Sequence, residues 1–267
     1  MTDMSDNDYS LLDRPEIVMG LFHPRPEYGS IERVTNTIDV LIPVENNILV
    51  AGRFHMTEKS AQNILFFHGN GEIASDYDEL GPIYNRMGMN FLVVDYRGYG
   101  RSTGRPTVST MMKDCHAIFE FTKRWLEENG YGGAFIVMGR SLGSASALEL
   151  ISLHKELING LVLESSFAHT GPFLELLGIN TSEIGFREEK GFRNLEKIQT
   201  WNKVTLIIHA EYDHIFPFSE GQALYDACSS PYKTLLKIPG ANHNDIFMRG
   251  LEPYMKAVKV LSEGIEV

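Results

Sequence analysis

From Asn63 onward, short apolar runs alternate with longer stretches of helical character. The apolar runs are NILFF, FLVVD, AFIVM, LVLE, TLIIH and TLLKI, and the helical stretches lie near 76–88, 107–129, 142–155, 218–228 and 244–263. Continuous apolar runs are typical of strands that are buried on both faces. Strands that alternate with helices form a mostly parallel sheet covered by helices on both sides. The sequence therefore predicts an α/β fold.

Three segments fall outside this alternation. Residues 1–34 are largely polar, and we expect them to form an N-terminal arm ahead of one domain over residues 35–267. The run TIDVLIPVENNILVAGRFH predicts a hairpin, for which the edge of a sheet is the natural place. Residues 166–202 lie between two predicted strands but are longer than a simple crossover. This length predicts an inserted cap.

Composition and charge narrow the class of protein. The chain has 35 acidic and 24 basic residues, so it lacks the positive charge that nucleic-acid binding requires. Its two cysteines, Cys115 and Cys228, are expected to be packed thiols rather than a disulfide. No apolar run approaches the roughly 18 residues of a transmembrane segment, and the start of the chain does not resemble a signal peptide. We expect a cytoplasmic globular protein of undetermined oligomeric state.

The pattern Gly-x-Ser-x-Gly occurs twice, as GRSTG at 100–104 and as GRSLG at 139–143. In a nucleophile elbow, the serine lies on a sharp turn between a buried strand and a helix. The strand-like run AFIVM precedes GRSLG, and good helix formers follow it. GRSTG instead lies in a glycine-rich loop before Pro106. We therefore predict that Ser141 is a nucleophile and that Ser102 is a loop serine.

A serine nucleophile needs a general base, usually a histidine, that is oriented by a carboxylate. In parallel sheets these groups gather at the carboxyl ends of strands. Asp213 follows TLIIH and His243 follows TLLKI, so we expect them to be the acid and the base. Both could instead be turn or helix-cap residues. Glu164, at the end of LVLE, is the alternative acid.

Acyl transfer also requires donors for the oxyanion of the tetrahedral intermediate. The segment FFHGNGE follows the first parallel strand, and its glycines either turn N–H groups inward or make an ordinary tight turn. We expect the backbone N–H groups of Asn70 and Leu142 to be the two donors. His68 is expected to be a structural hydrogen-bonding residue.

Other chemistries are not favoured by the sequence. The segment HAEYDH at 209–214 groups histidines with carboxylates, but it lacks the His-Glu-x-x-His spacing and a helix that would place ligands on one face. Neither a phosphate-binding loop that ends in Gly-Lys-Ser/Thr nor a dinucleotide fingerprint is present in the sequence. We expect no metal and no cofactor.

Five sequence blocks together resemble the successive motifs of the α/β-hydrolase superfamily: ILFFHGNGE, VVDYRGYGRSTGRP, GRSLGSA, HAEYDHIFP and GANHND. The resemblance covers about residues 38–263 and is greatest to the "HGN" serine hydrolases related to protein depalmitoylases, bud-emergence-type hydrolases and monoacylglycerol lipases. It implies that Ser102 is not catalytic and that the DYRGYG loop helps to form the wall of the site. At Ser144 many relatives carry a second glycine, a departure that concerns local packing.

The expected function is hydrolysis of carboxylic esters or thioesters through an acyl-enzyme, with a small-molecule or acylated substrate. Two alternatives remain open. A serine peptidase of the same fold could hold a substrate amine with acidic cap residues such as Glu183, Glu188 or Glu189. A binding or signalling protein could keep the triad with little turnover.

The cap carries apolar residues at spacings that would give a short helix one apolar face: Phe173, Leu174, Leu176, Leu177 and Ile179. This face could pack on the helices that cover the sheet. It could instead roof an acyl pocket beside Ser141, together with Phe216 and Phe247 from loops near the acid and the base. A cap of this length predicts a modest pocket that accepts short to medium acyl chains.

Overall fold

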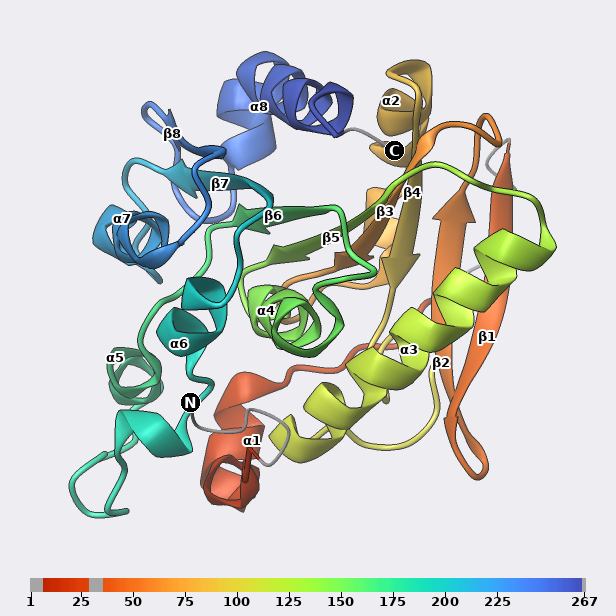
Figure 1. Ribbon diagram of the computed structural model, residues 1–267. Coiled ribbons are helices and arrows are strands. Elements are labelled where there is room, and N and C mark those ends of the chain that lie inside the picture. The colour runs from red at the N-terminus through yellow and green to blue at the C-terminus, as the bar shows by residue number, and fades with distance from the viewer. Residues whose placement is uncertain (1–6, 29–35, 266–267) are drawn as a thin grey trace.

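A computed structural model describes residues 7–28 and 36–265, which are built around one eight-stranded sheet (Figure 1). Its strands are β1 (Thr37–Glu45), β2 (Ile48–His55), β3 (Gln62–Phe67), β4 (Met89–Val94), β5 (Phe135–Arg140), β6 (Gly160–Glu164), β7 (Val204–Ala210) and β8 (Lys233–Ile238). Their order is β1-β2-β4-β3-β5-β6-β7-β8. The hairpin β1–β2 and the pair β2–β4 are antiparallel, and the other pairs are parallel. The predicted α/β fold is confirmed.

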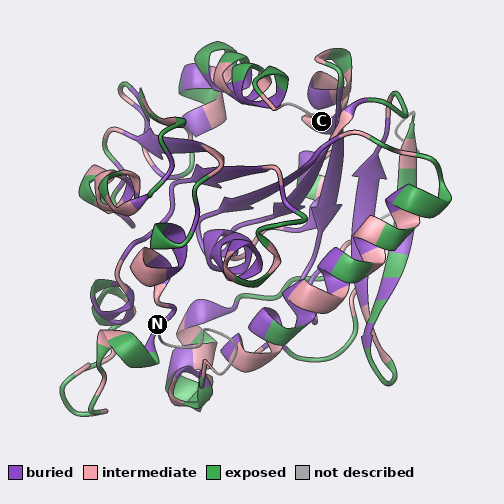
Figure 2. Cartoon of the chain, in the orientation of Figure 1, coloured by how far each residue is buried: buried purple, intermediate pink, exposed green. Residues whose placement is uncertain are grey.

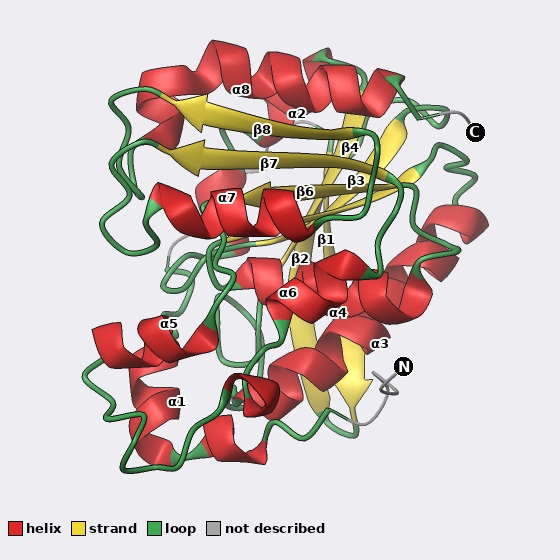
Figure 3. Ribbon diagram, turned by 60° about the vertical axis from the view of Figure 1, so that its left-hand side comes forward, coloured by secondary structure: helices red, strands yellow, loops and turns green. Residues whose placement is uncertain are grey.

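Helices cover both faces of the sheet (Figure 3). The α-helices are α1 (Pro15–Leu21), α2 (Gly81–Arg86), α3 (Val108–Glu128), α4 (Gly143–His154), α5 (Thr170–Leu176), α6 (Asn194–Gln199), α7 (Phe218–Ala227) and α8 (Ile246–Glu263). Three short 3₁₀ segments, Ser10–Asp13, Ala74–Tyr77 and Glu188–Lys190, complete the described helices. Helices α2 and α8 lie over one face, and α3, α4, α6 and α7 lie over the other.

The central strands are buried on both faces because successive side chains point to opposite sides of the sheet. In β5, Val137 packs into the core under α3 and α4, whereas Ile136 and Met138 pack into the core under α2 and α8. The central strands β3 to β7 are accordingly buried along most of their length, while the outer surfaces of the helices are exposed (Figure 2). This two-sided burial explains why the strands were recognisable as continuous apolar runs.

The structure departs from the sequence-based expectations in three places. Of the two hairpin strands, only β1 lies at an edge of the sheet, because β2 pairs with both β1 and β4. The expected helix near 76–88 is a 3₁₀ turn followed by the short α2, since Pro82 is tolerated only in the first turn of a helix. Helix α6, inside the expected cap 166–202, packs against α4 and α7. That part of the segment therefore belongs to the layer that covers the sheet.

The described part of the N-terminal arm is anchored to the rest of the molecule. Leu12, Ile17 and Leu21 are fully buried in the larger hydrophobic core. Helix α1 lies beside α5, where the position of a Cβ on Gly20 would be 3.4 Å from the side chain of Leu177 (Figure 1). The proposed boundary between residues 34 and 35 falls outside the described residues.

Candidate active site

Ser141 lies on the turn between β5 and α4. Its φ angle is +52°, in the left-handed region that residues with a side chain rarely adopt. Close packing requires the flanking glycines. A Cβ on Gly139 would lie 2.4 Å from the carbonyl oxygen of Gly143, and a Cβ on Gly143 would lie 2.2 Å from that of Phe67. The local structure is therefore that of a nucleophile elbow.

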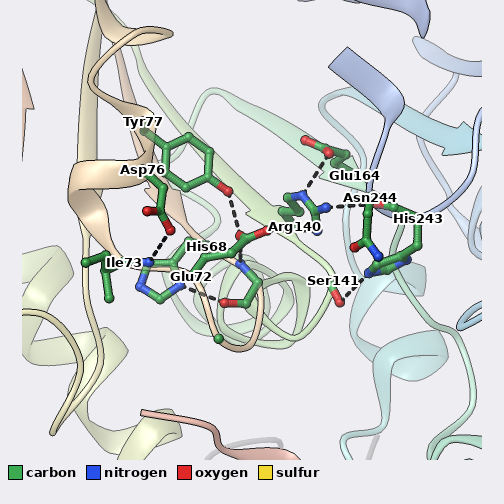
Figure 4. A network of polar contacts seen from close by, with 12 residues as sticks. His68, Glu72, Ile73, Asp76, Tyr77, Arg140, Ser141, Glu164, His243 and Asn244 are labelled. Atoms are coloured by element: carbon green, nitrogen blue, oxygen red, sulfur yellow. Dashed lines mark hydrogen bonds and ion pairs between the residues drawn. The ribbon is translucent and has the colours of Figure 1, made fainter. Parts of the chain in front are cut away.

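The loops after β7 and β8 bring Asp213 and His243 to this turn. Nε2 of His243 lies 3.0 Å from Oγ of Ser141, and Nδ1 lies 2.7 Å from Oδ2 of Asp213. All three residues are buried. Figure 4 shows the imidazole beside the serine hydroxyl. These separations suit proton transfer from a serine to a histidine that a carboxylate orients.

Asp213 is held in its charged form by its surroundings. Burial by itself would raise the pKa of this carboxyl, but the hydrogen bond to His243 and the nearby backbone donors hold its pKa below the ordinary value. Its Oδ1 accepts hydrogen bonds from the N–H groups of Ile215 and Phe216, at 3.0 and 2.8 Å. One carboxylate oxygen is therefore fixed by the backbone while the other faces the imidazole.

Glu164, the alternative acid, has different partners. Tyr254 donates its O–H to Oε2 at 2.7 Å, and Nε of Arg140 lies 3.1 Å from Oε1. Burial raises the pKa of this carboxyl above its ordinary value, although Arg140 opposes the shift. The side chain of Glu164 is thus directed at Arg140, as Figure 4 shows, and Asp213 is the carboxylate that contacts His243.

Ser102 lies in the loop between β4 and α3, away from this constellation. Its Oγ accepts a hydrogen bond from the N–H of Ala51 at 2.9 Å, and its own N–H donates to the carbonyl of Tyr99 at 2.8 Å. The DYRGYG residues 95–100 are all described, and none of them lines the cavity at Ser141. The loop instead contacts a residue of the cavity wall, because the hydroxyl of Tyr99 donates a hydrogen bond to Oδ1 of Asn70 at 2.7 Å.

The two expected oxyanion donors both border the cavity at Ser141. Asn70 follows β3, and Leu142 immediately precedes α4. Within the described part of the chain, neither backbone N–H has a hydrogen-bond partner. His68, expected to be structural, is buried with Nδ1 2.8 Å from the carbonyl of Gly69 and Nε2 3.2 Å from Oδ1 of Asp95. Both ring nitrogens of His68 therefore lie within hydrogen-bonding distance of other protein groups.

The cavity beside Ser141 has a volume of about 360 Å³. Four of the five residues expected to line it do so: Phe173, Leu176, Leu177 and Phe216. Phe247 does not, because it lies on the first turn of α8, where its ring packs against Tyr254 at 4.8 Å in the other core. Leu174, also on α5, is fully buried in the larger core. This short helix therefore contacts both the core and the cavity.

The N-terminal arm contributes cavity residues that sequence reasoning missed. Gly20 and His23 line the cavity, although the sequence pattern of the arm indicates no functional site. The N–H of His23 donates to Oδ1 of Asn70 at 2.8 Å, and its Nδ1 lies 2.7 Å from Nδ2 of the same side chain. Neither residue belongs to a periodic pattern, so the sequence contains no local signal for this contact.

The HAEYDH segment directs its polar side chains to separate places. Nε2 of His209 lies 2.7 Å from the carbonyl of Phe216, Asp213 contacts His243, and His214 lines the cavity. Among residues 7–28 and 36–265, no group of three or more histidine, cysteine or acidic side chains is arranged to hold a metal ion.

Comparison with known proteins gives a consistent result. The profile of a family described as "Serine aminopeptidase, S33" matches residues 58–181. "Alpha/beta hydrolase domain-containing protein 17B" from Homo sapiens is 29% identical over 73% of this chain and 64% of its own length. "Alpha/beta hydrolase domain-containing protein aho-3" from Caenorhabditis elegans is 32% identical over 68% of this chain and 52% of its own length. The chain thus spans about half to two thirds of these relatives.

A solved structure extends the similarity to nearly the whole fold. The esterase Pf2001 from Pyrococcus furiosus superposes with a TM-score of 0.73 and 18% identity, over 91% of this chain and 98% of its own. The chain belongs to the α/β-hydrolase superfamily. The human and nematode relatives support the branch of this superfamily that the sequence blocks suggested. Among the described helices of this α/β-hydrolase, none is both long and apolar enough to cross a bilayer.

Proposed function

We propose that this α/β-hydrolase cleaves carboxylic esters or thioesters through an acyl-enzyme formed on Ser141. The proposal rests on one observation above all. The hydroxyl of Ser141, on a strained elbow, lies 3.0 Å from Nε2 of His243, whose Nδ1 lies 2.7 Å from Asp213. Ser141 and His243 both border a cavity that a substrate could enter. The name of the structurally similar Pyrococcus protein, an esterase, agrees with the proposal.

In the first half of the reaction, His243 accepts the hydroxyl proton through Nε2 as Oγ of Ser141 bonds to the acyl carbon. The N–H groups of Asn70 and Leu142 stabilise the oxyanion that develops. His243 then donates this proton to the leaving alcohol or thiol, whose bond to the acyl carbon breaks. In the second half, His243 removes a proton from the water that attacks the acyl carbon. The bond between the acyl carbon and Oγ of Ser141 then breaks, and His243 returns the proton to Oγ as the acid leaves.

The walls of the cavity favour an acyl group of limited size. Apolar side chains from α5 and from the loop after β7 line it: Phe173, Leu176, Leu177, Ile215 and Phe216. A volume of about 360 Å³ is near the lower end of the roughly 300–1,000 Å³ that small-molecule sites occupy. We therefore propose short to medium acyl chains as the preferred substrates.

The surroundings of the acidic cap residues do not favour a peptidase. Glu188 accepts hydrogen bonds from the N–H groups of Thr170 and Gly171 at the start of α5. Glu183 pairs with Asn180 on the exposed side of the cap. Neither these two glutamates nor Glu189 borders the described cavity, so they are not placed to hold a substrate amine.

Two measurements test the proposal. A fluorophosphonate probe should label the wild-type protein on Ser141, because only an activated serine reacts readily with it. A panel of acyl esters, acyl thioesters and aminopeptidase substrates should then show turnover of the first two classes. Absence of labelling, or cleavage of the peptide substrates alone, would contradict ester hydrolysis as the function.

A further inference from the structure

Arg140, the residue before Ser141, is buried and contacts three separate segments of the site. Its Nη2 donates to the carbonyl oxygen of His243 at 2.8 Å, and its Nε lies 3.1 Å from Oε1 of Glu164. Its Nη1 lies 3.4 Å from Oε1 of Glu72. Figure 4 shows the guanidinium between these three groups. The planar guanidinium of arginine carries hydrogen-bond donors on several sides and therefore suits this position.

The contact with Glu72 reaches the loop that carries Asn70. Oε2 of Glu72 accepts the N–H of Gly69 and the hydroxyl of Tyr77, each at 2.6 Å. Burial alone would raise the pKa of Glu72, but the charge of Arg140 and these donors hold its pKa below the ordinary value. A charged carboxylate therefore fixes the peptide group between His68 and Gly69, in the loop that carries Asn70.

The contact with His243 acts on the backbone of the residue that supplies the imidazole. Arg140 fixes its carbonyl group, and Asp213 fixes Nδ1 of its ring at 2.7 Å. The contact with Glu164 reaches the elbow, because the N–H of Ser141 donates to the carbonyl of Glu164 at 2.9 Å. One side chain thus joins the loops of the proposed base, the proposed oxyanion donors and the nucleophile.

We propose that Arg140 is a positioning residue for the hydrolytic reaction, because its guanidinium holds the loops of Asn70, Ser141 and His243 in one arrangement. The inference rests on the proposed function. A displacement of about 1 Å between reacting groups can lower the rate about 100-fold, so loosening these loops should reduce turnover more than substrate binding.

Charge gives a second reason for an arginine here. Glu72 and Glu164 both contact Arg140, and Glu72 also borders the cavity at Ser141. A carboxylate without a counter-charge beside the reacting groups would oppose the development of a negative oxyanion. The single positive charge of Arg140 offsets part of the negative charge of these carboxylates. A lysine would keep the positive charge but, as a point charge on a flexible stem, would not reproduce the three contacts.

The test is Arg140→Lys, with Arg53→Lys as a matched control. Arg53 is also buried and also has three partners, which are the carboxylates of Glu27, Asp39 and Asp78, outside the cavity at Ser141. The kcat and KM for a short-chain ester, the rate of fluorophosphonate labelling and the midpoint of urea unfolding should be measured for each protein.

We expect Arg140→Lys to lower kcat and the labelling rate by about 10- to 100-fold, with KM within about threefold of wild type. Arg53→Lys should lose stability while kcat stays within about threefold of wild type. A folded Arg140→Lys protein with wild-type kcat would overturn the inference. A raised KM with unchanged kcat would also overturn it, since Arg140 would then be a substrate-binding group.

If Arg140→Lys does not fold, Glu72→Gln provides the same test, because it keeps the shape of the side chain and removes its charge. A lower kcat at unchanged KM is the expected result, and a wild-type kcat would contradict the proposed arrangement. Failure of the proposed function is separable from these outcomes, since the wild type itself would then neither react with the probe nor turn over the ester.

Discussion

Nδ1 of His243 lies 2.7 Å from Oδ2 of Asp213, which joins the loops after the last two strands of the sheet. Because this contact orients the imidazole, we expect Asp213→Asn to lower kcat for ester hydrolysis by about 10³- to 10⁴-fold. Glu164→Gln should change kcat less than about tenfold, since its carboxyl contacts Arg140 and Tyr254 instead. Steady-state kinetics of both variants tests this assignment. A large loss of kcat in Glu164→Gln together with a nearly normal kcat in Asp213→Asn would show that the acid is Glu164, at the end of β6.

The two Gly-x-Ser-x-Gly serines should respond differently to the same substitution. Ser141→Ala should abolish fluorophosphonate labelling and nearly all esterase activity, because it removes the hydroxyl 3.0 Å from His243. Ser102→Ala should keep most of the activity and lose only the stabilisation from the hydrogen bond with Ala51, about 1 kcal/mol. Labelling that persists in Ser141→Ala and disappears in Ser102→Ala would overturn the assignment of the elbow.

Substrate chain length should depend on α5 and the residue that follows it. Leu176 and Leu177 line the cavity, so replacing both with alanine should enlarge it and shift the preferred acyl chain to longer esters. Acetyl ester turnover should continue. Initial rates over a series of ester lengths measure the effect, and Leu153→Ala with Leu157→Ala is a matched control, because both leucines are exposed outside the described cavity. An unchanged profile in the folded cavity variant would show that selectivity lies elsewhere.

Stability should fall in acid through His55, which is fully buried on β2. Burial, helped by the charge of Arg53, lowers the pKa of His55 from 6.5 to about 4. The unfolded chain therefore binds more protons than the folded chain between these values, so the free energy of unfolding decreases as pH falls from 6.5 to 4. This shift corresponds to at most about 3 kcal/mol.

His55→Gln removes the titrating group and keeps a polar side chain near Thr37. It should lower stability at pH 7 but flatten the dependence between pH 6.5 and 4, which urea titrations at a series of pH values would show. A variant whose stability falls as steeply as that of the wild type over this range would assign the effect to other groups.

The α/β architecture could be predicted from the sequence because its signals are local. Six mainly apolar runs identified the parallel strands β3 to β8, and β3 to β7 are buried along nearly their whole length. The spacing of glycines around Ser141 likewise predicted a tight turn, because close approach of β5, α4 and β3 excludes a side chain at either glycine. Such features depend on neighbours in the chain and on the geometry of one element.

Tertiary structure decided what depends on contacts between distant segments. The sequence offered Asp213 and Glu164 at the ends of adjacent strands, and only the packing of Arg140 and Tyr254 on Glu164 left Asp213 to contact His243. Phe247 packs against the core under α8 rather than at the cavity, because the start of that helix sets the direction of its ring. Gly20 and His23 reach the cavity because the buried side chains of the arm hold it across the molecule. Periodicity records which face of an element is apolar, whereas the partner of that face is set by the packing of the whole chain.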